Sequence, residues 1–197
     1  MKKLGLAALS AAMVASFSAS ASTTSATASW QGVISGIVAG ETIMITGRDG
    51  AEVVPIGQLM RNTSGSLVGP DIQLEAWTNT GTAATPVPGE LIEVGTTIND
   101  DIAGGATAYS GLEWQVTDIA TFVEGAPVNG IGWTVNNGNT EIAAFDGMGA
   151  LTSGTLATDN IIKVNVASSD DTATKNVIDS HSGKDAAVSV TIVLTGS

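Results

Sequence analysis

Short runs of alternating apolar and polar residues recur along the chain, separated by stretches rich in Gly, Asn, Asp and Pro. A period of two places neighbouring side chains on opposite faces, which is typical of a β-strand with one face against a core. The runs are rich in Thr, Val and Ile, residues that favour strands. The pattern predicts strands over residues 41–46, 51–56, 72–77, 112–117, 131–135, 140–145, 161–166 and 188–195.

Two of the segments between these strands have the composition of hairpin turns. Asn136-Asn137-Gly138 separates two alternating runs, and Asn-Gly in that position is a strong short-range hairpin signal. Gly47-Arg48-Asp49-Gly50 predicts a second hairpin, which would pair residues 41–46 with residues 51–56.

Helix is expected in only two places, as one or two turns over residues 118–124 and one turn over residues 174–178. Residues 78–89, 99–105 and 168–184 are polar or rich in Gly and Pro, so they are expected to be irregular connections. We find no internal repeat and no linker that divides the chain. The sequence therefore predicts an all-β fold, with one antiparallel β-sandwich as its domain.

The first 21 residues have the layout of a signal peptide. Lys2 and Lys3 precede an apolar run from Leu4 to Phe17, and Ala19-Ser20-Ala21 provides small residues at a cleavage site. The apolar run is shorter than a membrane span requires. We therefore expect export, with a mature chain that begins at Ser22 and has no stable membrane insertion.

The mature chain is strongly acidic and has few residues of the types that usually carry out catalysis. It carries 5 basic against 19 acidic residues, a net charge of 5 − 19 = −14, which argues against nucleic acid and anionic lipid as partners. There is no cysteine, which excludes thiolate metal sites and disulfides, and His181 is the single histidine. We expect no enzyme activity, no cofactor and no metal site.

An alternating strip lies near the mature N-terminus, at residues 26–36. One face of the strip carries Ala26, Ala28, Trp30, Gly32 and Ile34, and the other is mostly polar. The strip could be the first strand of its own sandwich. Alternatively, it could leave its subunit and complete the sheet of a neighbour by strand addition, a head-to-tail contact that builds a fibre.

The chain resembles the major pilins of chaperone–usher pili, in their cysteine-free branches (the common-pilus and alpha-type colonisation-factor classes). The resemblance depends on the signal peptide, a Ser/Thr/Ala leader, the N-terminal strand containing Ala-Thr-Ala-Ser-Trp, the Gly/Thr/Val-rich body and the terminal strand ending Leu-Thr-Gly-Ser. The layout matches over the whole chain, but the residue pattern matches only at the two ends. The disulfide and near-terminal tyrosine of the classical type are missing, since the single tyrosine is Tyr109.

The resemblance implies an incomplete immunoglobulin-like sandwich over residues 37–197, completed by donor-strand exchange, with residues 22–36 as leader and donor strand. Ala26, Ala28, Trp30, Gly32 and Ile34 would fill the groove of a neighbour. The acceptor groove would be lined by Val188, Val190, Ile192 and Leu194. The implied partners are identical subunits, a periplasmic chaperone and an outer-membrane usher. The implied product is an extracellular, cell-surface fimbria that supports adhesion or biofilm formation, with a host or surface glycan as a candidate receptor.

A secreted carbohydrate-binding β-sandwich is the alternative, since the chain has four tryptophans that could stack on sugars. Trp114 and Trp133 share faces with apolar residues, so we expect them in the core. Trp77 lies beside Glu75 on the polar face of its strand, which makes it the candidate for a surface contact.

The remaining polar candidates carry weaker signals. His181 lies in a polar loop and no Gly-x-Ser-x-Gly motif accompanies it, so we expect a solvated histidine. The pairs Asp100-Asp101 and Asp170-Asp171 lack the ligand spacing of a calcium loop, so we expect solvated carboxylates.

Overall fold

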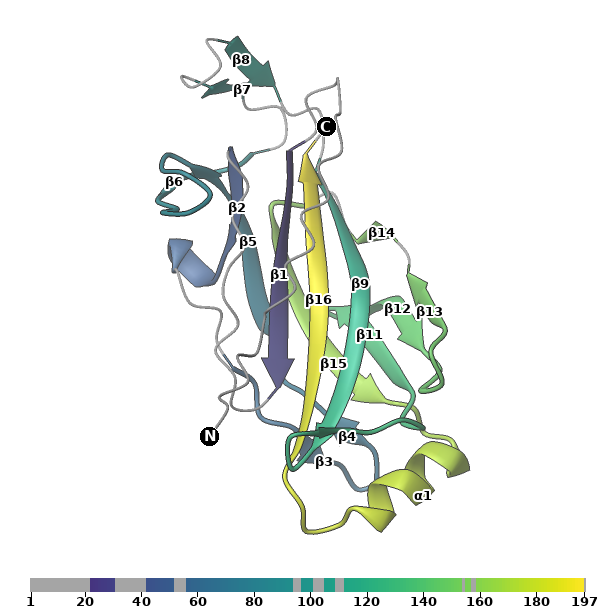
Figure 1. Cartoon of the computed structure of the whole chain (residues 1–197). Helices are drawn as coiled ribbons and strands as arrows, with labels where there is room; N and C mark the ends of the chain where they lie inside the picture. The colour runs from purple at the N-terminus through teal and green to yellow at the C-terminus, as the bar shows by residue number, and fades with distance from the viewer. Residues whose placement is uncertain are drawn as a thin grey trace, which may run out of the picture.

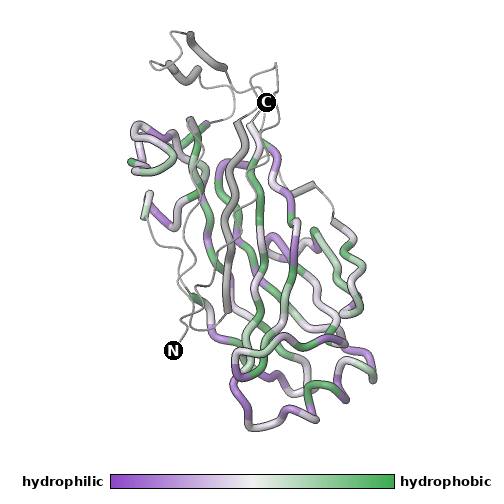
Figure 2. The backbone as a smooth tube through the Cα atoms, viewed as in Figure 1, coloured by the Kyte–Doolittle hydropathy of each residue, from purple (hydrophilic) through white to green (hydrophobic). Residues whose placement is uncertain are grey.

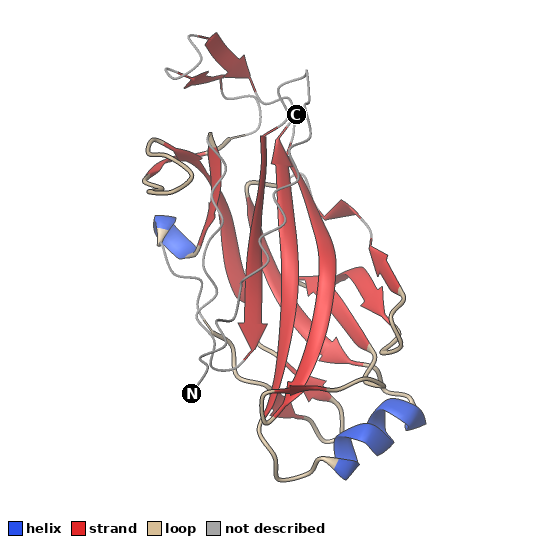
Figure 3. Cartoon of the chain, viewed as in Figure 1, coloured by secondary structure: helices blue, strands red, loops and turns tan. Residues whose placement is uncertain are grey.

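The computed structural model describes residues 22–30, 42–51, 56–93, 97–100, 105–108, 112–153, 155–156 and 159–196. Within these residues the chain is almost entirely β-strand, with one α-helix and one short 3-10 turn, as Figure 3 shows. The predicted all-β class is therefore confirmed. The signal peptide expected over residues 1–21 lies outside the described residues.

The strands form two antiparallel sheets and a separate hairpin. The first sheet has the order β1–β16–β9–β10, with β14 also paired to β9. Its strands are β1 (Ser22–Trp30), β16 (Ala186–Gly196), β9 (Leu112–Val123), β10 (Ala126–Pro127) and β14 (Thr155–Leu156). The separate hairpin consists of β7 (Thr97–Asp100) and β8 (Gly105–Ala108).

The second sheet has β15 at its centre, with β11, β12 and β13 on one side and β5, β2, β6, β4 and β3 on the other. Its strands are β2 (Ile43–Thr46), β3 (Met60–Arg61), β4 (Leu67–Val68), β5 (Ile72–Asn79), β6 (Pro88–Leu91), β11 (Trp133–Asn137), β12 (Thr140–Phe145), β13 (Leu151–Ser153) and β15 (Ile161–Ser168).

The two sheets pack face to face over one hydrophobic core. Alternate residues of β9, β15 and β16 are buried, so each strand presents its apolar face to the other sheet. Figure 2 shows hydrophobic segments along the strands of this sandwich and hydrophilic segments in many of the connections. Trp114 and Trp133 are fully buried in this core, as expected.

The strand order matches that of an immunoglobulin-type sandwich, in which strands A, B, E and D form one sheet and C, F and G the other. Strands A to F correspond in chain order to β2, β5, β9, β11, β15 and β16. One sheet contains β2–β5–β15–β11, which matches A–B–E–D, and the other contains β9–β16, which matches C–F. The place of strand G, beside F, is taken by β1. The N-terminal segment therefore lies where the last strand of such a sandwich lies.

One predicted helix is wrong, because β9 continues to Val123 through the residues for which helical turns were expected. Val116 lies opposite Ile192 and Asp118 opposite Thr191, so Thr117 is an extra residue, a β-bulge. The bulge moves the buried face from residues 112, 114 and 116 to residues 119, 121 and 123. Because the buried positions shift by one residue at the bulge, the alternation of apolar and polar residues is interrupted in the sequence although the strand is continuous.

The two hairpin predictions have different outcomes. The turn at Asn136-Asn137-Gly138 is confirmed, with Asn137 opposite Thr140 in the β11–β12 pair. The turn at residues 47–50 does not produce the second hairpin, because β2 pairs with β5 and the chain enters the 3-10 turn η1 (Arg48–Gly50). Residues 52–55 of its expected second strand lie outside the described residues.

The one α-helix, α1 (Thr172–Ser180), contains the predicted turn at residues 174–178 and connects β15 to β16. It covers one end of the sandwich, close to β3 and β4, whereas the C-terminus lies at the other end (Figure 1). We call these the helix end and the C-terminal end.

Candidate functional site

The proposed donor strand and acceptor wall lie side by side in the structure. β1 pairs antiparallel with β16 in one continuous register, from Ser22 opposite Gly196 to Trp30 opposite Val188. Within this ladder, Ala26 lies opposite Ile192 and Ala28 opposite Val190. In this single chain the strand is therefore paired in cis. Gly32 and Ile34, the other two predicted donor positions, lie outside the described residues.

The four residues of the predicted acceptor wall face the core. Val188, Val190, Ile192 and Leu194 are all fully buried and belong to the main hydrophobic cluster. Directly opposed positions of an antiparallel pair lie on the same face of the sheet. Positions 26, 28 and 30 of β1 are therefore the core-side positions of the strand, opposite this wall.

β1 and β2 run in the same direction, although they belong to different sheets. Figure 1 shows both strands running from the C-terminal end toward the helix end, and they lie beside each other. β2 starts with Ile43 opposite Thr78, near the last residue of β5. β1 therefore ends at the helix end, whereas β2 begins at the C-terminal end.

The helix end is closed by α1, whose N-terminus is capped by a carboxylate. Asp171 accepts hydrogen bonds from the backbone N–H of Thr174 at 2.8 Å and from its hydroxyl at 3.0 Å, and these bonds lower the pKa of Asp171. Thr174 and Ile178 are the buried residues of the helix. The Thr174 hydroxyl also accepts from the backbone N–H of Gly132 at 3.1 Å, which fixes α1 to the residues before β11.

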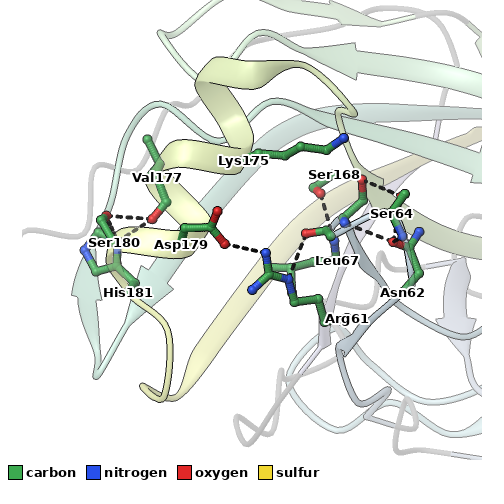
Figure 4. Close-up of polar contacts among 12 residues, drawn as sticks. Arg61, Asn62, Ser64, Leu67, Ser168, Lys175, Val177, Asp179, Ser180 and His181 are labelled. Carbon is green, nitrogen blue, oxygen red and sulfur yellow. Dashed lines mark hydrogen bonds and ion pairs between the residues drawn. The ribbon is translucent and has the colours of Figure 1, made fainter.

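The β3–β4 hairpin is attached to α1 by charged side chains, which Figure 4 shows. Arg61 donates to Asp179 of the helix and, at 3.1 Å, to the carbonyl of Gly65. Asp170 accepts from the Ser66 hydroxyl at 3.0 Å and lies 2.6 Å from the Lys175 ammonium. Lys175 first and Ser66 second hold the pKa of Asp170 below its ordinary value. The acidic pair Asp170-Asp171 thus serves to hold the helix.

Trp77, the predicted surface contact, is half-buried and bonded to its own strand. Its indole N–H donates to Glu75 Oε2 at 2.8 Å, and its ring lies against Gly50 of η1. Glu75 is only 3% exposed and also accepts from Gln73 at 2.7 Å and from the Gly50 N–H at 3.3 Å.

Two opposing effects act on this carboxylate. Burial alone would raise the pKa of Glu75, but hydrogen bonds from Trp77, Gln73 and the backbone of η1 outweigh it and lower the pKa. Glu75 therefore stays ionised and fixes both the Trp77 ring and the η1 turn on the outer face of β5.

The other polar candidates have local roles. His181 follows α1, where its Nδ1 lies 2.9 Å from the Val177 carbonyl oxygen and 3.0 Å from the Ser180 hydroxyl. The indole N–H groups of the buried tryptophans are also occupied, Trp114 by the Asp159 carbonyl and Trp133 by the Thr121 hydroxyl, each at 2.8 Å. Asp101 lies outside the described residues.

Neither a metal site nor a membrane-spanning helix is found among the described residues. They contain no group of three or more His, Cys, Asp or Glu placed to hold a metal ion. No helix in the described part of the chain is both long and apolar enough to cross a membrane.

One surface loop was missed by the sequence analysis. Asp146 Oδ1 accepts the backbone N–H groups of Met148, Gly149 and Ala150 at 2.7, 3.0 and 3.0 Å, which lowers the pKa of Asp146. Met148, in the middle of this loop, is 83% exposed. The Asp-Gly-Met-Gly sequence is the signal that could have predicted the turn, because Asp and Gly favour such geometry.

Comparisons of this chain with protein-family models, with curated proteins and with solved structures gave no match.

Proposed function

We propose that this chain is the structural subunit of a bacterial surface pilus, and that it polymerises head-to-tail by lending β1 to a neighbouring copy. The observation that carries the proposal is the position of β1. The N-terminal strand occupies the place of strand G beside β16, at the edge of an otherwise immunoglobulin-type sandwich. A strand from a neighbouring copy can take that place in the same register.

The directions of β1 and β2 favour exchange between copies. β1 spans about 27 Å at the usual rise per residue, and the twelve residues 31–42 between β1 and β2 reach at most about 43 Å. Within one chain, this link has to return along the length of β1 to reach the start of β2. Between two copies stacked end to end, the same link only has to cross the junction, since β1 and β2 already point the same way.

The buried residues of the acceptor wall explain why another strand has to take the place of β1 when β1 is donated to a neighbour. If β1 leaves and nothing takes its place, β16 becomes an unpaired edge beside Val188, Val190, Ile192 and Leu194 of the core. Each of these side chains contributes roughly 1.5–3 kcal/mol when fully buried, and an open edge invites other strands. A subunit awaiting assembly would therefore need a periplasmic chaperone in the groove, and an outer-membrane usher would exchange it for the next β1.

The assembled product in this proposal is an extracellular fimbria at the cell surface, which supports adhesion or biofilm formation. The carbohydrate-binding alternative gains no separate support, because Trp77, its surface candidate, is bonded to Glu75 of the same strand.

A cysteine pair tests donation directly, because the chain contains no cysteine. Ser29 lies opposite Ser189, and opposed Cα atoms of an antiparallel pair lie about 4.5–5.5 Å apart, within the range of a disulfide. We expect Ser29→Cys/Ser189→Cys subunits, assembled and then oxidised, to run as a ladder of covalent multimers on a non-reducing denaturing gel.

The matched control places the partner of Ser189 in β9. Ala120 lies opposite Ser189 in the β9–β16 pair, so Ala120→Cys/Ser189→Cys should form a disulfide within each chain and no ladder. A quantitative disulfide within single chains of the Ser29/Ser189 variant would show that β1 completes its own sandwich and would overturn the proposal.

A further inference from the structure

Two large apolar side chains stand out at the helix end. Met148 is 83% exposed and Met60 is 60% exposed, the two highest values among the large hydrophobic residues of the described part of the chain. Met60 precedes Arg61, which binds Asp179 of α1. The loop of Met148 is joined to the same end because the Gly147 carbonyl accepts the Gly130 N–H at 2.7 Å. Gly132, two residues after Gly130, is in turn bonded to Thr174 of α1. Met60 thus belongs to the hairpin, and Met148 to the loop, that border α1.

Met148 is held on a loop of fixed geometry. Asp146 orders three successive backbone N–H groups, including that of Met148. Gly147 has a φ of +79° and packs so closely that a Cβ there would lie 2.7 Å from the Ile131 carbonyl carbon. A backbone ordered in advance loses little entropy when its side chain is buried by a partner. A methionine side chain can also adapt its shape to that partner.

We propose that the surface formed by Met60, Met148 and α1 is the docking surface for a second copy of this chain, namely the copy whose β1 is received in the groove. This inference rests on the proposed function. Trp30, the last residue of β1, lies opposite Val188, which is near the start of β16 and thus at the helix end. The body of the donor is therefore attached at the end where Met60 and Met148 lie.

The short link between β1 and β2 indicates that a second copy of the chain covers this docking surface. Only twelve residues, 31–42, separate the received strand from β2 of its own subunit. Such a short tether holds the donor close to this end at an effective concentration on the order of millimolar. The end that the donor presents is its C-terminal end, where β2 begins and β5 ends. Val87 lies there too, because its N–H donates to Asn79, the last residue of β5, and it is 50% exposed. Apolar side chains are thus available on both sides of the junction.

The three methionines of the mature sequence allow a direct test by oxidation. Met44 is 1% exposed, and it serves as the internal control for Met60 and Met148. We would treat the full-length mature chain with hydrogen peroxide, after separating monomer and polymer by gel filtration. Mass spectrometry of peptides would then give the rate of sulfoxide formation at each methionine. N-acetyl-methionine amide gives the reference rate of a free side chain.

We expect Met148 to oxidise near the reference rate in monomers and at least about fivefold more slowly in polymers, since exposure controls susceptibility. Oxidation of Met60 should also be slower in polymers than in monomers, and oxidation of Met44 should be slow in both fractions. Polymers that give the Ser29/Ser189 ladder but oxidise Met148 at the reference rate would overturn this inference and leave the proposed function standing. A chain that forms no ladder would overturn both.

A charge at the junction provides the second test. Met148→Lys should lower the temperature at which polymers dissociate while the Ser29/Ser189 ladder still forms, because donation does not use Met148. The control is Thr140→Lys, an exposed site at the other end of the β11–β12 pair. Equal dissociation temperatures for the two lysine variants would contradict the inference.

Discussion

At the scale of single residues, carboxylates fix loops to the sandwich. Asp146 orders the turn before β13, Asp171 caps α1, and Glu75 holds η1 and the Trp77 ring. In each case one carboxylate accepts two or more donors that would otherwise lack a partner in the protein. Several acidic residues of this acidic chain are therefore structural.

Glu75→Ala should destabilise the folded chain, because Gln73, Trp77 and Gly50 all lose their acceptor. A buried donor left without a partner costs about 1–3 kcal/mol, so we expect the free energy of unfolding at pH 7 to fall by about that amount in urea titrations. Glu141→Ala, at an exposed position of β12, is the control. An unchanged urea midpoint for Glu75→Ala would contradict this assignment.

The same site predicts a pH dependence. The pKa of Glu75 is lowered in the folded chain, so its stabilising effect is complete above the ordinary glutamate pKa of about 4.3. This effect is lost as the pH falls through the lower, folded-state pKa. The difference in unfolding free energy between the wild type and Glu75→Ala should therefore shrink in acid. A difference that stayed constant down to the acid transition would count against an ionised Glu75.

At the scale of elements, β1 is an edge strand made mainly of small residues. Its sequence, Ser-Thr-Thr-Ser-Ala-Thr-Ala-Ser-Trp, has a single large side chain, at its last position. The register with β16 places alternate residues opposite the buried wall. Adjacent residues of β1 should therefore respond very differently to a charge.

Ala28→Asp should abolish donation, because position 28 lies opposite Val190 on the core side. An unpaired charge taken out of water costs several kcal/mol. Thr27→Asp, at the neighbouring position on the outer face opposite Thr191, should still polymerise. The groove of the Ala28→Asp chain is intact, so this chain should still accept a wild-type strand and shorten wild-type polymers in mixtures. Equal polymer lengths with both variants would contradict the predicted register.

At the scale of the whole molecule, the proposed fibre has to bring strongly acidic copies together. Without residues 1–21, which the sequence predicts to be a signal peptide, the chain has a net charge of −14. Four of its five basic residues are already paired with carboxylates of the same chain, namely Arg48, Arg61, Lys175 and Lys184. Like-charged copies repel at distances up to the screening length of the solution. The burial of apolar surface in the groove and at the junction has to exceed this repulsion.

Salt should therefore accelerate polymerisation. The screening length falls from about 30 Å at 0.01 M salt to about 8 Å at 0.15 M, so we expect the initial rate of growth, followed by light scattering, to rise over this range. A rate that is unchanged, or that falls with added salt, would show that repulsion between copies does not limit assembly.

The sequence predicts most of the strands, because a period of two is a local property of consecutive residues. The runs that contain Leu74, Trp114, Val164 and Val190 all became strands with these side chains in the core. The Asn-Gly turn was also predictable, since Gly138 adopts a φ of +59° that glycine tolerates without strain. The bulge at Thr117 marks the limit of such reasoning, since one extra residue erased the signal for half of β9.

What the sequence by itself determined is the class of the fold, the core face of most strands and the alternating strip at residues 26–36. Only the tertiary structure decided which strands are neighbours: β2 beside β5, β1 beside β16, and the β3–β4 hairpin against α1. It also brought the hairpin of Met60 and the loop of Met148 to one end of the sandwich. The physical reason is that strand pairing joins residues far apart along the chain, through backbone groups that are the same in every sequence, so local patterns leave the choice of partner open.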